Sequence, residues 1–128
     1  MASTLFLRRI LALDAASCAL LGLAMALLAP SLSLLFGLPD GLVRGAGLML
    51  LPLACFIGWL ASRPAPPAPM VWLVILGNLA WTAESLFLLG QTSPTAVGAA
   101  FVTIQALAVL GLAGLEYVGL RRARELTA

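Results

Sequence analysis

Long apolar segments alternate with short polar breaks along this chain. Each apolar segment approaches or exceeds the roughly 20 residues that a helix rising about 1.5 Å per residue needs to cross about 30 Å of hydrocarbon. The pattern therefore predicts an all-α membrane protein, a four-transmembrane-helix antiparallel bundle. The apolar segments cover residues 10–28, 42–61, 71–89 and 96–120, and the predicted helices cover about 5–29, 41–62, 70–90 and 94–121.

The breaks carry residues that favour turns and helix starts. Asp40 precedes the second apolar segment and is a candidate N-cap, and Ser93 followed by Pro94 matches an N-cap with proline at the first helical position. The segment 31–38 lies between two prolines and is too short to span, so we expect an interfacial turn or short helix there. Because the connections are short, consecutive helices should be antiparallel neighbours within one integral membrane domain, 1–128.

The first apolar segment has an alternative interpretation as a secretory signal, because Arg8 and Arg9 precede it. It is longer than a typical signal core and contains Asp14, and it ends without an Ala-x-Ala cleavage pattern. These features favour a retained transmembrane helix.

The composition supports a lipid environment and excludes several functions. Hydrophobic residues make up 62% of the chain and charged residues 9%, whereas soluble domains are about a quarter charged. The chain has no histidine, which removes the usual ligand of haem, copper and catalytic zinc and the commonest general base. Cys18 and Cys55 lie in separate apolar segments without CxxC spacing, so we expect packing roles. No cofactor and no nucleic-acid partner are expected.

The arginines predict the orientation, because positive flanks are retained in the cytoplasm. With four spans, Arg44 alone falls on one side of the membrane, and all other arginines fall on the opposite side. Both termini are therefore predicted in the cytoplasm, and Trp59, Trp72 and Tyr117 would form an aromatic belt there. Positive charge carried by arginine without lysine is typical of a GC-rich bacterial genome, so we expect a multi-pass protein of the bacterial inner membrane. The arginines of the predicted cytoplasmic side are Arg8, Arg9, Arg63, Arg121, Arg122 and Arg124.

Asp14 is the first ionisable residue inside an apolar segment, and such residues are candidates for function. It lies on a helical stripe with Cys18, Gly22 and Ala26, whose small side chains allow another helix to approach closely. We therefore predict that Asp14 faces the bundle and forms a salt bridge with Arg63 or Arg121, a structural role.

The third predicted helix has a polar face. Asn78, Thr82 and Ser85 follow one side of it, with Trp81 and Glu84 beside them. This face should avoid lipid. Glu84 is predicted to pair with Arg44, the one arginine on its side of the membrane.

The fourth predicted helix carries Gln105 and Glu116 on one face, because eleven residues make about three turns. We predict a hydrogen bond between Gln105 and Asn78 near mid-membrane. Glu116 lies close to Arg121 and Arg122 and is expected to reach the cytoplasmic headgroups. In the second helix, Pro52 should introduce a kink.

Together these residues suggest two roles that the sequence does not separate. They could line a ligand or ion pathway, or they could hold the four helices in register. The pathway candidates are Asp14, Arg44, Asn78, Trp81, Glu84 and Gln105, and the helix-packing residues are Cys18, Gly22 and Ala26.

Three stretches carry a family resemblance: Arg44-Gly45-Ala46-Gly47 running to Leu51-Pro52, Gly77-Asn78-Leu79-Ala80-Trp81, and Glu116-Tyr117 with Gly119-Leu120-Arg121-Arg122. In these stretches the chain resembles a group of small, uncharacterised bacterial four-helix membrane proteins. The resemblance implies the fold over most of the chain and no activity. The glutamate of small multidrug resistance transporters and the filter segment of fluoride channels are not matched.

Two functional hypotheses remain. The first is a non-enzymatic accessory or scaffold subunit that binds membrane lipid or quinone and associates with itself or a larger membrane complex. The alternative is a small oligomeric transporter or channel, with Glu84 or Asp14 as the coupling carboxylate. An enzyme is disfavoured, because the sequence shows no histidine, nucleophile motif or paired carboxylates.

Overall fold

The computed structural model describes residues 2–127, and side chains are described for residues 4–124. Within this range the chain forms helices and no strand, and four of the helices are long and apolar enough to span a membrane. The prediction of an all-α bundle of four membrane-spanning helices is confirmed. The helices are α1 (Ala2–Leu27), α2 (Ala29–Phe36), α3 (Asp40–Ser62), α4 (Ala68–Gln91) and α5 (Ala96–Thr127).

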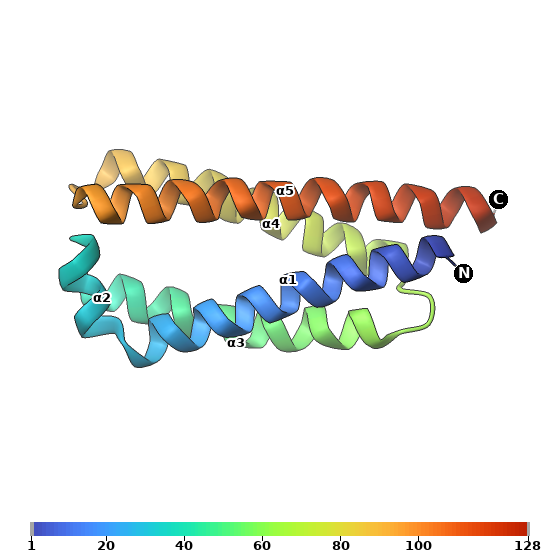
Figure 1. Cartoon of the computed structure of the whole chain (residues 1–128), viewed down its shortest axis with the longest axis horizontal. Helices are drawn as coiled ribbons and strands as arrows, with labels where there is room; N and C mark the ends of the chain where they lie inside the picture. The colour runs from blue at the N-terminus through green and yellow to red at the C-terminus, as the bar shows by residue number, and fades with distance from the viewer. Residues whose placement is uncertain (1, 128) are drawn as a thin grey trace.

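The four long helices are arranged as two hairpins. Helix α1 packs along α3, and α4 packs along α5 (Figure 1). The hairpins are joined mainly where α1 packs on α5, whereas α3 and α4 scarcely touch. The prediction that consecutive spanning helices are neighbours therefore holds within each hairpin, but α3 and α4 make little contact, because the hairpins pack together through α1 and α5.

Figure 1 also shows which connections share an end of the bundle. The two chain ends lie at one end, together with the proline-rich connection between α3 and α4. Helix α2 lies at the opposite end, with the start of α3 and the start of α5. A chain that crosses a membrane four times returns to the side on which it started. Both termini of a bundle of four spans therefore lie at the same end.

Helix α2 corresponds to the predicted interfacial segment. It begins at Ala29, with Pro30 in its first turn, and ends at Phe36, followed by the C-cap Gly37, whose φ of 68° lies in the left-handed region that favours glycine. The N–H groups of Gly37 and Leu38 both donate to the Ser33 carbonyl, at 2.9 and 3.3 Å. These bonds complete the last turn of α2.

The helix caps differ from those predicted. Helix α3 begins at Asp40, whose carboxyl group makes no capping bond and instead lies 3.8 Å from the Arg44 guanidinium. Helix α5 begins after Thr95, whose Oγ1 accepts a 3.0 Å hydrogen bond from the Gly98 N–H. The N-caps predicted at Asp40 and Ser93 are therefore wrong. The Thr95 hydroxyl group caps α5 and also contacts α2.

Helix α2 is fastened to the start of α5 through its last carbonyl groups. The Thr95 N–H donates to the Phe36 carbonyl at 3.0 Å, and Thr95 Oγ1 donates to the Leu35 carbonyl at 2.7 Å. A Cβ on Gly98 would overlap the Phe36 carbonyl, so glycine is needed at this approach. The Phe36 and Phe101 rings stack with centroids 4.5 Å apart. This contact joins the two hairpins at the α2 end.

Helices α1 and α3 approach closely where Gly22 faces Gly47. A Cβ on Gly47 would lie 2.6 Å from the Ala26 backbone nitrogen and 2.7 Å from the Met25 Cβ. A Cβ on Gly22 would lie 3.0 Å from the Gly47 carbonyl oxygen. The small-residue stripe of α1 therefore lies against α3, as small residues allow in membrane helices.

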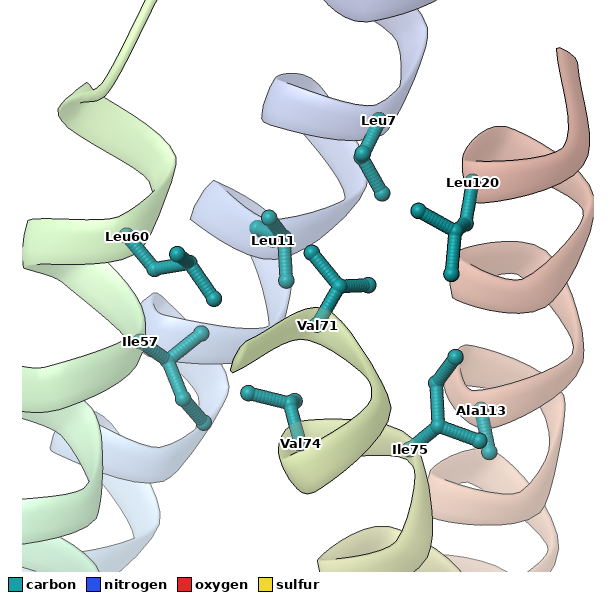
Figure 2. Packing of buried hydrophobic residues seen from close by; sticks show 9 residues of the cluster. All are labelled: Leu7, Leu11, Ile57, Leu60, Val71, Val74, Ile75, Ala113 and Leu120. Carbon is teal, nitrogen blue, oxygen red and sulfur yellow. The ribbon is translucent and has the colours of Figure 1, made fainter. Parts of the chain in front are cut away.

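Two clusters of buried apolar side chains hold the bundle, one towards each end. Figure 2 shows the cluster nearer the chain termini, to which all four long helices contribute. The second cluster lies nearer α2 and includes Met25, Phe36 and Val43. The polar residues described below lie beside the first cluster, with Glu116 between Ala113 and Leu120 along α5. The first cluster consists of Leu7, Leu11, Ile57, Leu60, Val71, Val74, Ile75, Ala113 and Leu120.

Candidate functional site

Asp14, Asn78 and Glu116 form a buried polar group that we call the carboxyl cluster. The Asn78 side-chain amide Nδ2 donates a 2.8 Å hydrogen bond to Asp14 Oδ2 and another of 2.8 Å to Glu116 Oε1. The three residues come from α1, α4 and α5, and their side chains are 2%, 9% and 0% exposed. Two carboxyl groups therefore share one amide donor in the centre of the bundle.

Each member lies on the buried stripe of its helix. Asp14 follows Leu11 by three residues, and Glu116 lies three residues after Ala113 and four before Leu120. Residues at these spacings share a helix face. On α4, Asn78 is followed on the same face by Thr82, whose Oγ1 donates to the Asn78 carbonyl at 2.9 Å. The apolar neighbours that bury each helix therefore bury the polar residue too.

Glu116 is the functional candidate that the sequence interpretation missed. We expected it to reach the headgroups beside Arg121 and Arg122, and this prediction is wrong because Glu116 is fully buried. Its helix meets α1 closely, since a Cβ on Gly119 would lie 3.1 Å from the Leu7 Cα. That approach turns Glu116 towards Asp14. The signal available in the sequence was the apolar spacing to Ala113 and Leu120.

The predicted salt bridge of Asp14 with Arg63 or Arg121 is also wrong. No ion pair to either carboxyl group of the cluster is found among the side chains of residues 4–124. Arg63 lies over the Trp59 ring at 5.2 Å, and Arg121 lies over the Tyr117 ring at 5.9 Å. Arginine at the ends of the spans contacts aromatic rings there, whereas Asp14 accepts its hydrogen bond from a neutral amide.

The carboxyl cluster retains unused hydrogen-bonding capacity. Glu116 Oε2 has no hydrogen-bond partner among the described residues although it is buried. Asp14 Oδ1 accepts a hydrogen bond from the Cys18 thiol, at a long Sγ to Oδ1 distance of 3.6 Å. A buried oxygen without a partner is uncommon in folded proteins and calls for a specific explanation.

Gln105 belongs to a second polar group, with Trp81 and Ser85. Trp81 Nε1 donates to Gln105 Oε1 at 2.8 Å, and Gln105 Nε2 donates to Ser85 Oγ at 3.0 Å. Gln105 Nε2 also donates to the Val102 carbonyl at 3.0 Å. The predicted bond between Gln105 and Asn78 is wrong, because Asn78 gives both of its amide hydrogens to the carboxyl cluster.

The predicted pair of Glu84 and Arg44 is not formed. Arg44 instead faces Asp40, four residues earlier on the same helix, and both side chains are 48% exposed. Glu84 is exposed. The ion pair between Glu84 and Arg44 does not form because their helices, α4 and α3, scarcely touch. Asp40 lies one turn from Arg44 on the same helix, so their pairing does not depend on contact between helices.

Two adjoining cavities lie between the hairpins. The larger cavity has a volume of about 700 Å³ and is lined by residues of all four long helices, among them Met25, Ala46, Glu84 and Phe101. The smaller cavity has a volume of about 380 Å³. It is lined by Asp14, Cys18, Leu50, Phe56, Asn78 and Leu112, among others. Leu21, Trp81 and Gln105 line both cavities, so the two form one elongated cleft.

The lining of the cleft is apolar with a negative bias. Its carboxyl groups are Asp14 in the smaller cavity and Glu84 in the larger, and no arginine lines either cavity. Of the pathway candidates, Asp14, Asn78, Trp81, Glu84 and Gln105 therefore line the cleft, whereas Arg44 does not. Within the described residues, no group of three or more histidine, cysteine or acidic side chains is placed to hold a metal ion.

Searches with protein-family models, curated proteins and solved structures found no match to this chain.

Proposed function

We propose that this chain is a non-enzymatic protein of the bacterial inner membrane that binds a hydrophobic ligand, a lipid or quinone, in the cleft between its hairpins. The observation that carries the proposal is the cleft itself. Its cavities of about 700 and 380 Å³ fall within the range of about 300–1,000 Å³ that is usual for small-molecule sites. Few polar groups converge on an otherwise apolar lining, which is also typical of such sites.

The position of the cleft favours a ligand that enters from the bilayer. The cleft lies where α3 and α4 separate, and both helices are candidate spans that carry exposed leucines outside the cleft, such as Leu48 and Leu76. A molecule that passes between these helices travels through hydrocarbon rather than water. This route selects for ligands with an alkyl or isoprenoid chain.

The proposed orientation places both termini in the cytoplasm. Arg8 near the start of α1, Arg63 just after α3 and Arg121 near the end of α5 fall at the bundle end that holds the termini, whereas Arg44 near the start of α3 falls at the α2 end. A membrane-impermeant maleimide added to intact cells should label Gly41→Cys and spare Ala65→Cys, in a background without native cysteines. Labelling of Ala65→Cys instead would reverse the orientation.

Trp81 provides a direct reporter of ligand binding, because it lines both cavities. Replacing the exposed Trp59 and Trp72 by phenylalanine leaves Trp81 as the one tryptophan. We expect decylubiquinone, a neutral quinone probe, to quench the fluorescence of this variant saturably in detergent.

Glycine substitutions supply a blocking variant and a matched control. Gly77 lines the smaller cavity and Gly111 lines neither, and a Cβ at either position would have no neighbour within 4 Å. Gly77→Leu should therefore fill the cavity without strain and weaken quenching, whereas Gly111→Leu should leave it unchanged. Equal effects of the two substitutions, or linear quenching without saturation, would refute binding in the cleft.

An oligomeric transporter is the second candidate, and the buried pair Asp14 and Glu116 favours it, since ionisable groups inside membranes commonly serve transport. A proton gradient would then drive uptake of a cleft ligand into proteoliposomes, and Asp14→Asn would abolish the uptake. Binding without uptake under a gradient favours the accessory function.

A further inference from the structure

The smaller cavity combines a carboxyl group with aromatic rings. Asp14, Phe56 and Trp81 all line it. The Trp81 ring is held by its hydrogen bond to Gln105, and the Phe56 ring packs beside Trp59 with centroids 6.4 Å apart. An anionic group beside aromatic faces is the arrangement that binds ammonium and other organic cations, because each ring face attracts positive charge.

Glu116 adds a second carboxyl group immediately behind this lining. It shares the Asn78 amide with Asp14, and its Oε2 is buried without a hydrogen-bond partner among the described residues. Asp14 Oδ1 is engaged by the Cys18 thiol at 3.6 Å. The oxygens of the cluster can therefore accept more positive charge than the described side chains supply.

The helices around Asp14 and the smaller cavity contribute different groups. Helix α1 supplies Asp14 and the Cys18 thiol, α4 supplies the neutral amide of Asn78, and α5 supplies Glu116. Helix α3 faces the cavity with the apolar side chains of Leu50, Leu53, Phe56 and Ile57. The arginine nearest to Asp14 along α1 is Arg9, and its neighbour Arg8 donates from Nε to the Ala61 carbonyl at 3.0 Å.

Negative charge in such a place requires compensation. Two carboxylates taken out of water and held beside one amide repel each other, and in hydrocarbon they are stabilised by a bound proton or by a neighbouring cation. The hydrogen bonds from Asn78 stabilise the cluster but carry no positive charge. A proton is the smallest ion that can supply that charge.

We propose that the ligand of the smaller cavity is a lipophilic cation, such as a hydrophobic ammonium or phosphonium compound, whose charge takes the place of a proton shared by Asp14 and Glu116. The inference rests on the proposed function, because it assumes the hydrophobic cleft, and it assigns a cationic ligand in place of a neutral lipid or quinone to the smaller cavity. The exchange balances, because one positive charge enters the cavity as one proton leaves. The positive charge of the ligand lies beside Asp14, and the apolar groups of the ligand contact Phe56 and Leu112. Glu116, which lies outside the cavity lining, stabilises the charge through its proximity to Asp14.

Tetraphenylphosphonium and tetraphenylborate test the proposal, because they have the same shape and opposite charge. Calorimetric titration of the detergent-solubilised protein should give saturable binding of the phosphonium and none of the borate. Titration in buffers of different ionisation enthalpy should show about one proton released for each cation bound. Affinity for the phosphonium should rise with pH, since fewer protons then compete.

Isosteric variants locate the charge. Asp14→Asn and Glu116→Gln should each weaken phosphonium binding by about tenfold or more, which corresponds to about 1.4 kcal/mol. Glu84→Gln, which alters the larger cavity, should change the affinity less than about twofold. Gly77→Leu should also weaken binding, and it leaves both carboxyl groups intact. It keeps the test decisive if a carboxyl variant fails to fold.

The outcomes separate this inference from the proposed function. Equal binding of the two ions, no proton release, or full affinity in folded Asp14→Asn would overturn the inference. If decylubiquinone still quenches Trp81 under those conditions, the hydrophobic cleft stands and its preference for cations fails. If neither the quinone nor the phosphonium binds, both proposals fail.

Discussion

Asn78 on α4 donates a 2.8 Å hydrogen bond to Asp14 on α1, and these two helices belong to different hairpins. Its second amide hydrogen goes to Glu116 within its own hairpin. One side chain therefore ties α1, α4 and α5 together at a buried position. Asn78 also lines the smaller cavity, to which α3 contributes only apolar side chains.

Loss of the Asn78 amide should destabilise the protein strongly. Asn78→Leu leaves two buried carboxyl groups without their donor, and we expect the free energy of unfolding to fall by about 2–4 kcal/mol. Reversible denaturation in mixed micelles measures this change. Adding Asp14→Leu and Glu116→Leu to the same chain should recover most of the loss, because the variant then has no buried carboxyl group at these two positions that lacks a donor. A triple variant less stable than Asn78→Leu would contradict this explanation.

The α1–α3 contact should reject any side chain at Gly47. A Cβ there would lie 2.6 Å from a backbone nitrogen of α1, so Gly47→Val must push the helices apart. We expect a loss of about 1–3 kcal/mol. Gly45→Val is the matched control on the same helix, since a Cβ at Gly45 would meet nothing within 4 Å. Thermal unfolding in detergent compares the two variants, and equal melting temperatures would argue against the close approach.

The N-terminal cap of α5 distinguishes the sequence prediction from the structure. Thr95→Val removes the bond from the Gly98 N–H and the bond to the Leu35 carbonyl, and it should cost about 1–2 kcal/mol. Ser93→Ala should change stability by less than about 0.5 kcal/mol, because Ser93 lies outside the cap. Chemical denaturation of both variants measures the difference. A larger effect at Ser93 than at Thr95 would restore the original assignment.

Arg44 and Glu84 should behave as independent residues. Arg44→Ala removes an exposed pair with Asp40 and should cost less than about 1 kcal/mol. In a double-mutant cycle with Glu84→Ala, the coupling energy should stay within about 0.3–0.5 kcal/mol of zero. Unfolding measurements on the two single variants and the double variant give this value. Coupling above that range would mean that the two side chains meet after all.

The main features of the fold follow from local properties of the sequence. The length of each apolar segment determines a membrane span, so the four spanning helices and the short segment before Pro39 were predictable without knowledge of their neighbours. The spacing of Cys18, Gly22 and Ala26 similarly indicated a face that another helix could approach. Orientation remains a prediction that rests on the positions of the arginines.

The partners of the polar residues were decided by the tertiary structure alone. The sequence placed Asp14, Asn78 and Glu116 on separate helices with suitable faces, but it did not determine that α1 would contact α5 while α3 and α4 would separate. In that arrangement Asn78 donates hydrogen bonds to both carboxyl groups, and Arg44 pairs with Asp40 on its own helix. The separation of α3 and α4 also leaves the cleft between the hairpins. The physical reason is that burial in hydrocarbon depends on the helix itself, whereas a hydrogen bond between helices depends on how each helix is rotated and which neighbour it meets.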